Sequence, residues 1–198
     1  MFSIPDPLHP AVVHFPIVLI LLGGMMAVVA VFLHRWHLPW VASGLLILGT
    51  TGAFVAVKTG ESAQEIVGEL PESVEQLLDE HEEWAERTEA VAAFAAIASV
   101  AAAILGMFVA RRESNRGAET TVASPGRATA GLFTISRVAS GFRMLTAVVA
   151  LIACVFLYQT AHRGGKLVYN YGVGVKHHAA TGPSPAKASI PEHDEDDH

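Results

Sequence analysis

The sequence is poor in cysteine and lacks the short motifs that mark common catalytic sites. Its single cysteine, Cys154, lies in an apolar run, so the chain has neither an internal disulfide nor a C-x-x-C-H site for covalent haem. It has no Walker loop, dinucleotide fingerprint or nucleophile elbow, and His81-Glu82-Glu83 lacks the second histidine of an H-E-x-x-H motif. Hydrolase and nucleotide chemistry therefore have little support, and we expect a non-catalytic protein.

Charged residues are scarce as well. They make up 16% of the 198 residues, whereas hydrophobic residues make up 52%, which is typical of a membrane protein rather than a soluble domain. The net charge of −6 is concentrated in one loop and in the C-terminal tail. This distribution argues against nucleic acid as a partner.

Several apolar runs have the length that crosses a lipid bilayer, which is about 17 to 25 residues for a helix. They predict helices at about 11–33, 40–57, 71–110 and 141–161. The third helix begins with an acidic amphipathic stretch in which His81 lies on the apolar stripe. We therefore expect an all-α integral membrane four-helix bundle over residues 1–175, followed by a disordered acidic tail at 176–198.

Small residues and turn residues predict the packing and the connections. Close helix approach is expected where small residues recur, at Gly44, Gly49 and Gly52 and at Ala98, Ala102 and Gly106. Residues 111–137 have the composition of a polar, arginine-rich linker with a flexible middle. The pair Gly164-Gly165 favours a sharp turn after the fourth helix.

The arginines predict the orientation. Arg35 follows the first helix and the linker 111–137 adds five more arginines, whereas Lys58 and Arg87 stand among many acids at the other end. By the positive-inside rule the arginine end is cytoplasmic. Both termini and the acidic loop are then expected on the outer, extracytoplasmic side.

The first helix begins with two histidines and two prolines. Pro10 suits a first helical turn because its missing N–H would be unpaired there. Pro16 removes a donor and frees the carbonyl of Val12, which predicts a kink beside His14.

The predicted topology places four histidines at the outer end: His9, His14, His81 and His162. Neutral imidazole binds haem iron, copper and zinc. Two of these rings on different helices would hold haem b axially, and the basic groups available to pair with its propionates are Arg87, Arg163 and Lys166.

Two other interpretations of these histidines remain. Copper or zinc would need three or four close ligands, for which Glu61, Glu82 and Glu83 are additional donors. Alternatively, the rings bind carbonyls or water in the interfacial zone of the membrane, which is common for histidines at helix ends.

Three segments together resemble a known family. LHPAVVHFPIVLILL at 8–22, DEHEEWA at 79–85 and HRGGKLVYNYGVGV at 162–175 are similar to the bacterial membrane proteins known as domain of unknown function 2231, over about residues 7–175. The resemblance implies a four-helix domain of the bacterial inner membrane whose motif histidines are His9, His14, His81 and His162. It also implies companionship with cytochromes and with respiratory or photosynthetic electron-transfer proteins.

From these features we expect a b-type cytochrome-like membrane protein that exchanges electrons with an extracytoplasmic redox partner. The alternatives are a cofactor-free structural or assembly subunit of a larger membrane redox complex, and a copper- or zinc-binding membrane protein.

Overall fold

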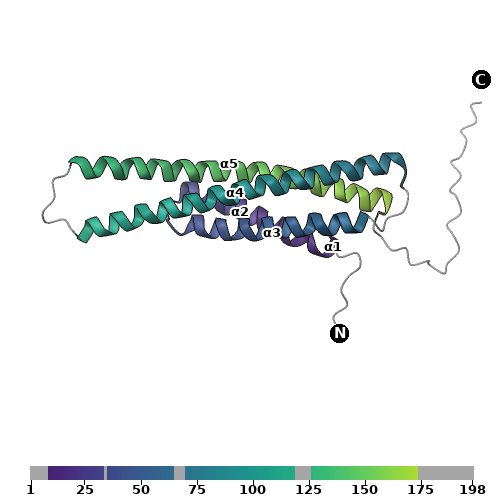
Figure 1. The fold of residues 1–198 in the computed structure, drawn as a ribbon, viewed down its shortest axis with the longest axis horizontal. Helices are drawn as coiled ribbons and strands as arrows, with labels where there is room; N and C mark the ends of the chain where they lie inside the picture. The colour runs from purple at the N-terminus through teal and green to yellow at the C-terminus, as the bar shows by residue number, and fades with distance from the viewer. Residues whose placement is uncertain (1–8, 34, 65–69, 119–125, 174–198) are drawn as a thin grey trace, which may run out of the picture.

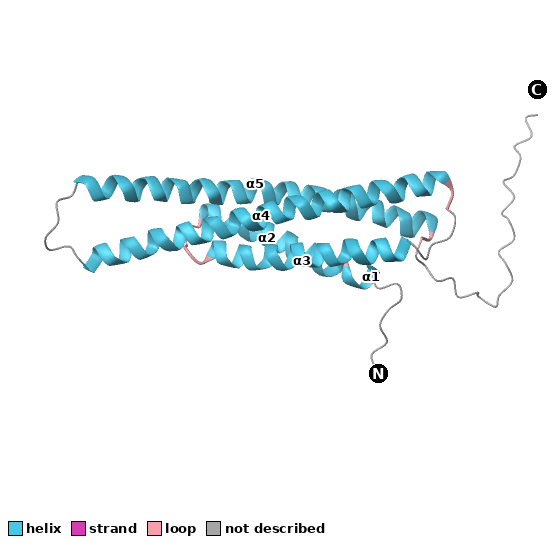
Figure 2. Ribbon diagram, in the orientation of Figure 1, coloured by secondary structure: helices cyan, strands magenta, loops and turns pink. Residues whose placement is uncertain are grey.

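The computed structural model describes residues 9–33, 35–64, 70–118 and 126–173, and this part of the chain is helical with short connections. The helices are, in order, α1 (His9–Val12), α2 (His14–Phe32), α3 (Leu38–Gln64), α4 (Glu72–Ala118) and α5 (Gly126–Tyr171). Helices α2 to α5 form one elongated bundle (Figures 1 and 2), in which α2 packs on α3 and α5, and α4 packs on α3 and α5.

Each of these long helices is long and apolar enough to cross a membrane. This confirms the predicted all-α, four-helix membrane bundle. The predicted tail at 176–198 lies outside the described residues.

The predicted first helix is divided at Val13, between α1 and α2. Pro16 has no N–H to give to the carbonyl of Val12. Around the break, the N–H of Val13 donates to the carbonyl of His9 at 3.1 Å, and the N–H of Ile17 donates to that of Val13 at 3.4 Å. The interruption lies beside His14, where the proline predicts it.

The other helices are longer than predicted. Helix α4 continues to Ala118 and α5 begins at Gly126, so the prediction of a polar linker over 111–137 is wrong for most of its length. Arginine, alanine and glutamate have favourable helix propensities, so a polar composition does not prevent a helix here. Gly164 and Gly165 also lie inside α5, and the positive φ found in the described part of the chain is at Gly172 (66°), so the predicted sharp turn is wrong as well.

Small side chains line the surfaces where helices meet. A Cβ at Gly49 would come 2.9 Å from Ile20 Cγ1 and 3.0 Å from the Ile20 backbone nitrogen, so α2 and α3 are nearly in backbone contact there. Ala98, Ala102 and Gly106 are buried as predicted. Gly44 is different: a Cβ there would meet nothing within 4 Å, so its prediction as a contact position is wrong.

Polar bonds inside the bundle join pairs of helices. The Ser43 and Ser99 hydroxyl oxygens are 2.9 Å apart and link α3 to α4, and Ser99 also donates to the carbonyl of Pro39 at 3.2 Å. The Thr88 and Thr160 hydroxyls, 3.1 Å apart, link α4 to α5. Large apolar side chains instead face outward, where a bilayer would lie; Phe15, Met25, Phe94, Ile97 and Leu151 are examples.

Helix lengths place the two ends of the bundle at opposite membrane surfaces. The 19 residues of α2 rise about 29 Å, close to the ~30 Å hydrocarbon thickness. The 47 residues of α4 rise about 70 Å, so α4 must project beyond the bilayer. Figure 1 shows α4 and α5 both extending past the α2–α3 turn at the left, where the two helices diverge. We call this end the arginine end, and the end with His9 the histidine end.

Candidate histidine site

His9 fastens α1 to the C-terminal half of α3. Its Nδ1 lies 2.8 Å from the carbonyl oxygen of Ala56. A carbonyl only accepts hydrogen bonds, so Nδ1 carries the proton and donates it. The Thr59 hydroxyl donates to the same oxygen at 3.0 Å. In the neutral ring, the lone pair that binds a metal is therefore on Nε2.

His81 makes the equivalent contact between α4 and α5. Its Nδ1 lies 2.9 Å from the carbonyl oxygen of Thr160, so this nitrogen is also the donor. Both rings are half-buried. Metal-binding histidines commonly donate one ring N–H to a backbone carbonyl, which fixes the ring and its tautomer. His9 and His81 both have this arrangement.

A glycine makes room for each ring. A Cβ at Gly60 of α3 would come 3.1 Å from His9 Cε1, and a Cβ at Gly164 of α5 would come 2.9 Å from His81 Cε1. Sequence reasoning missed both positions. A signal was present, because glycine inside a helix costs about 1 kcal/mol relative to alanine and its use there calls for a packing reason.

The two rings lie at the same end of the bundle and interact electrostatically. Protonated His9 and protonated His81 repel one another. Burial lowers the pKa of His9 below its ordinary value of 6.5, and the hydrogen bond to Ala56 offsets part of this effect. His9 is thus favoured in its neutral form, which is the form that binds a metal.

The other two predicted histidines have different surroundings in the structure. His14 and His162 are exposed, and the His162 ring stacks on Tyr158 of its own helix with centroids 6.0 Å apart. Across the described ranges, no group of three or more histidine, cysteine, aspartate or glutamate side chains is arranged to hold a metal ion. Within the described residues, the three or four close ligands expected for a copper or zinc site are thus not brought together.

The glutamates considered as extra ligands have other partners. Glu61 accepts from Lys58 at 2.6 Å, and Glu82 accepts from the Gln64 amide at 3.3 Å. Glu83 pairs with Arg87 one helical turn away. These contacts make the acids part of the polar surface at the histidine end.

The predicted propionate partners are divided between α4 and α5. Arg163 pairs with Glu80 at 3.0 Å and lies over the Trp84 ring, 4.9 Å from its centroid. Arg87 lies over the same ring at 5.2 Å. Lys166 is exposed. An anionic group beside His81 would compete with Glu80 for Arg163.

Comparison with known proteins gives a family match over most of the chain. Residues 5–177 match the family model described as a predicted membrane protein, DUF2231. No curated protein and no solved structure gave a match. The match spans α1 to α5 and includes all four predicted site histidines.

Proposed function

The chain belongs to the DUF2231 family of predicted membrane proteins, and we propose that its His9–His81 pair binds haem b at the histidine end of the bundle. The bound haem would make the protein a b-type cytochrome that exchanges electrons with an extracytoplasmic redox partner. The family itself has no stated activity, so this proposal rests on the site.

The observation that carries it is the matched hydrogen bonding of the two rings. Each Nδ1–H is bound to a backbone carbonyl of a neighbouring helix, at 2.8 Å for His9 and 2.9 Å for His81. Each neutral ring therefore offers Nε2 as its ligand atom. His9 and His81 would hold haem b through these nitrogens, a mode of binding that needs no cysteine.

Haem would supply a one-electron redox change when bound, and the chain would control its surroundings. Ala56 and Thr160 hold the tautomers through their carbonyls. Arg163 is the first cation that we assign to a propionate, because its guanidinium already pairs with the carboxylate of Glu80, the residue before His81. Arg87 and Lys166 are further propionate partners at the same end.

A visible spectrum of the detergent-purified full chain, oxidised and then reduced with dithionite, tests the proposal. We expect low-spin haem bands with about one iron per chain by metal analysis. His9→Ala and His81→Ala should lose these bands, whereas His14→Ala and His162→Ala, as matched controls, should keep them. Absence of haem, or bands that survive in the double variant His9→Ala/His81→Ala, would refute the assignment.

A second function has its own support. The same two histidines already make hydrogen bonds between α1 and α3 and between α4 and α5. These bonds stabilise the helix contacts without any cofactor. This favours a structural or assembly subunit of a larger membrane complex. It predicts co-purification with other membrane subunits and no bound haem, copper or zinc. A monomer that contains haem would exclude it.

We also propose that the chain lies in the bacterial inner membrane with its histidine end extracytoplasmic, since the arginine end should be cytoplasmic. In a Cys154→Ala background, Glu86→Cys and Glu113→Cys place single thiols at exposed positions of the two ends. An impermeant maleimide added to intact spheroplasts should label position 86 and spare position 113. The reverse pattern would invert the topology.

A further inference from the structure

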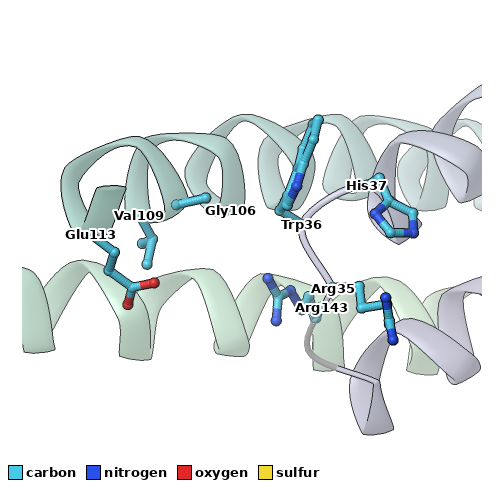
Figure 3. A pocket seen from close by; sticks show the side chains of 8 residues that line it. Arg35, Trp36, His37, Gly106, Val109, Glu113 and Arg143 are labelled. Atoms are coloured by element: carbon cyan, nitrogen blue, oxygen red, sulfur yellow. The ribbon is translucent and has the colours of Figure 1, made fainter. Parts of the chain in front are cut away.

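The arginine end contains a pocket that the proposed haem site does not use. Its volume is about 310 Å³. Three consecutive residues of the α2–α3 turn line it, together with residues of α4 and α5: Arg35, Trp36, His37, Gly106, Val109, Ala110, Glu113 and Arg143. Figure 3 shows Arg35 and Arg143 with their guanidinium ends directed to opposite sides, and Glu113 farther along α4. The pocket thus combines two arginines with one glutamate.

Arg143 reaches the pocket from α5 with an incomplete set of hydrogen bonds. Its Nε is buried and has no hydrogen-bond partner. Among the ion pairs found in the described ranges, none includes Arg143 or Arg35. A buried donor without an acceptor is unfavourable, so the guanidinium is suited to an oxygen-rich ligand.

Gly106 provides space for this guanidinium. A Cβ at position 106 would lie 3.2 Å from Nη2 of Arg143. Gly106 therefore serves the pocket as well as the packing of α4. The arginine is accommodated by the fold rather than left at the surface.

The pocket lies at the level of lipid headgroups. Arg35 follows directly after the apolar helix α2, whose length matches the hydrocarbon layer. The exposed Trp36 beside it is typical of the membrane–water interface. Arg143 lines the same pocket and is thus held at the same depth.

From these observations we propose that this pocket binds a phosphate group through Arg35 and Arg143, with an anionic phospholipid headgroup or a free phosphate as its source. The planar guanidinium presents several N–H donors that match phosphate oxygens. Glu113 repels the ligand and so limits its affinity.

The test uses the delipidated full chain in neutral detergent and native mass spectrometry. The probes are dioctanoyl phosphatidylglycerol, inorganic phosphate and, as an uncharged control, dioctanoylglycerol. We expect saturable binding of one phosphatidylglycerol per chain and no specific binding of dioctanoylglycerol. Arg143→Gln and Arg35→Gln should each weaken binding about tenfold or more, since a charge-assisted bond is lost. Glu113→Gln should strengthen it.

Arg112→Gln is the matched control, because Arg112 is an exposed arginine of α4 near this end that does not line the pocket. It should change the affinity by less than about twofold, as expected for an exposed charge. Arg35→Gln alters an exposed turn residue and carries the test if Arg143→Gln does not fold. If inorganic phosphate binds with the same variant pattern and phosphatidylglycerol does not, the source is free phosphate. If neither binds, or if Arg112→Gln weakens binding as much as Arg143→Gln, the proposal is wrong.

Discussion

The ring of His81 on α4 lies against Gly164 of α5, where a Cβ would come 2.9 Å from His81 Cε1. In the same place His81 Nδ1 donates to the carbonyl of Thr160, one turn earlier in α5. Glycine at 164 therefore lets an imidazole reach the backbone of a neighbouring helix. The pair defines how α4 and α5 meet at the histidine end.

Gly164→Ala should displace His81 and lower the free energy of unfolding by about 1–3 kcal/mol, the usual cost of overpacking. Gly165→Ala is the control, because a Cβ there meets nothing within 4 Å and the gain in helix propensity is the same. Thermal unfolding in detergent, followed by circular dichroism, measures both. Equal effects of the two variants would contradict the contact.

Gly49→Ala should separate α2 from α3. The added methyl group would lie 3.0 Å from the backbone nitrogen of Ile20, which cannot move as a side chain can. We expect a loss of about 1–3 kcal/mol in the free energy of unfolding. Gly44→Ala faces open space on the same helix and should be neutral or slightly stabilising. A stabilising Gly49→Ala would argue against the close approach.

Stability should depend on pH through His9. Because burial lowers its folded pKa below 6.5, the unfolded chain binds more protons than the folded chain at lower pH. The stabilising contribution is fully present above about pH 6.5 and is lost as the pH falls through the folded pKa. Unfolding measured between pH 8 and pH 5 should show this decline, and His9→Gln should reduce its slope. Parallel slopes for the two proteins would refute the prediction.

The Ser43–Ser99 contact should couple α3 to α4. A double-mutant cycle with Ser43→Ala and Ser99→Ala should give a coupling energy of about 0.6 kcal/mol, and at most about 1.7 kcal/mol, the range for hydrogen bonds between membrane helices. Ser62→Ala serves as the control, since the Ser62 hydroxyl bonds only to the Lys58 carbonyl of its own helix, on an exposed face. Additive single effects would show that the two serines act independently.

The membrane helices were predictable because spanning length and apolar composition are local properties. The break at Val13 was predictable as well, since Pro16 removes a specific donor from the first helix. The positions of the helix ends beyond the bilayer were not predictable. Residues 111–118 are polar and resemble a linker, but α4 continues through them as a helix because arginine, glutamate and alanine have favourable helix propensities.

The candidate sites divide in the same way. The sequence identified His9, His14, His81 and His162 by their place at one predicted end, and the structure gives His9 and His81 each a hydrogen bond to a backbone carbonyl of another helix. His14 and His162 were predicted at the same end but lie on exposed faces. The depth of a residue follows from its position along a helix. The direction in which its side chain points depends on how each helix is rotated against its neighbours.

By itself, the sequence determined that this is a multi-pass helical membrane protein with a histidine end and an arginine end, because hydropathy and charge act residue by residue along the chain. Tertiary structure alone decided that Gly60 and Gly164 accommodate histidines and that Arg143 shares a pocket with Arg35. These relations join residues from different helices. They depend on helix register and spacing, which arise only when the four helices pack together.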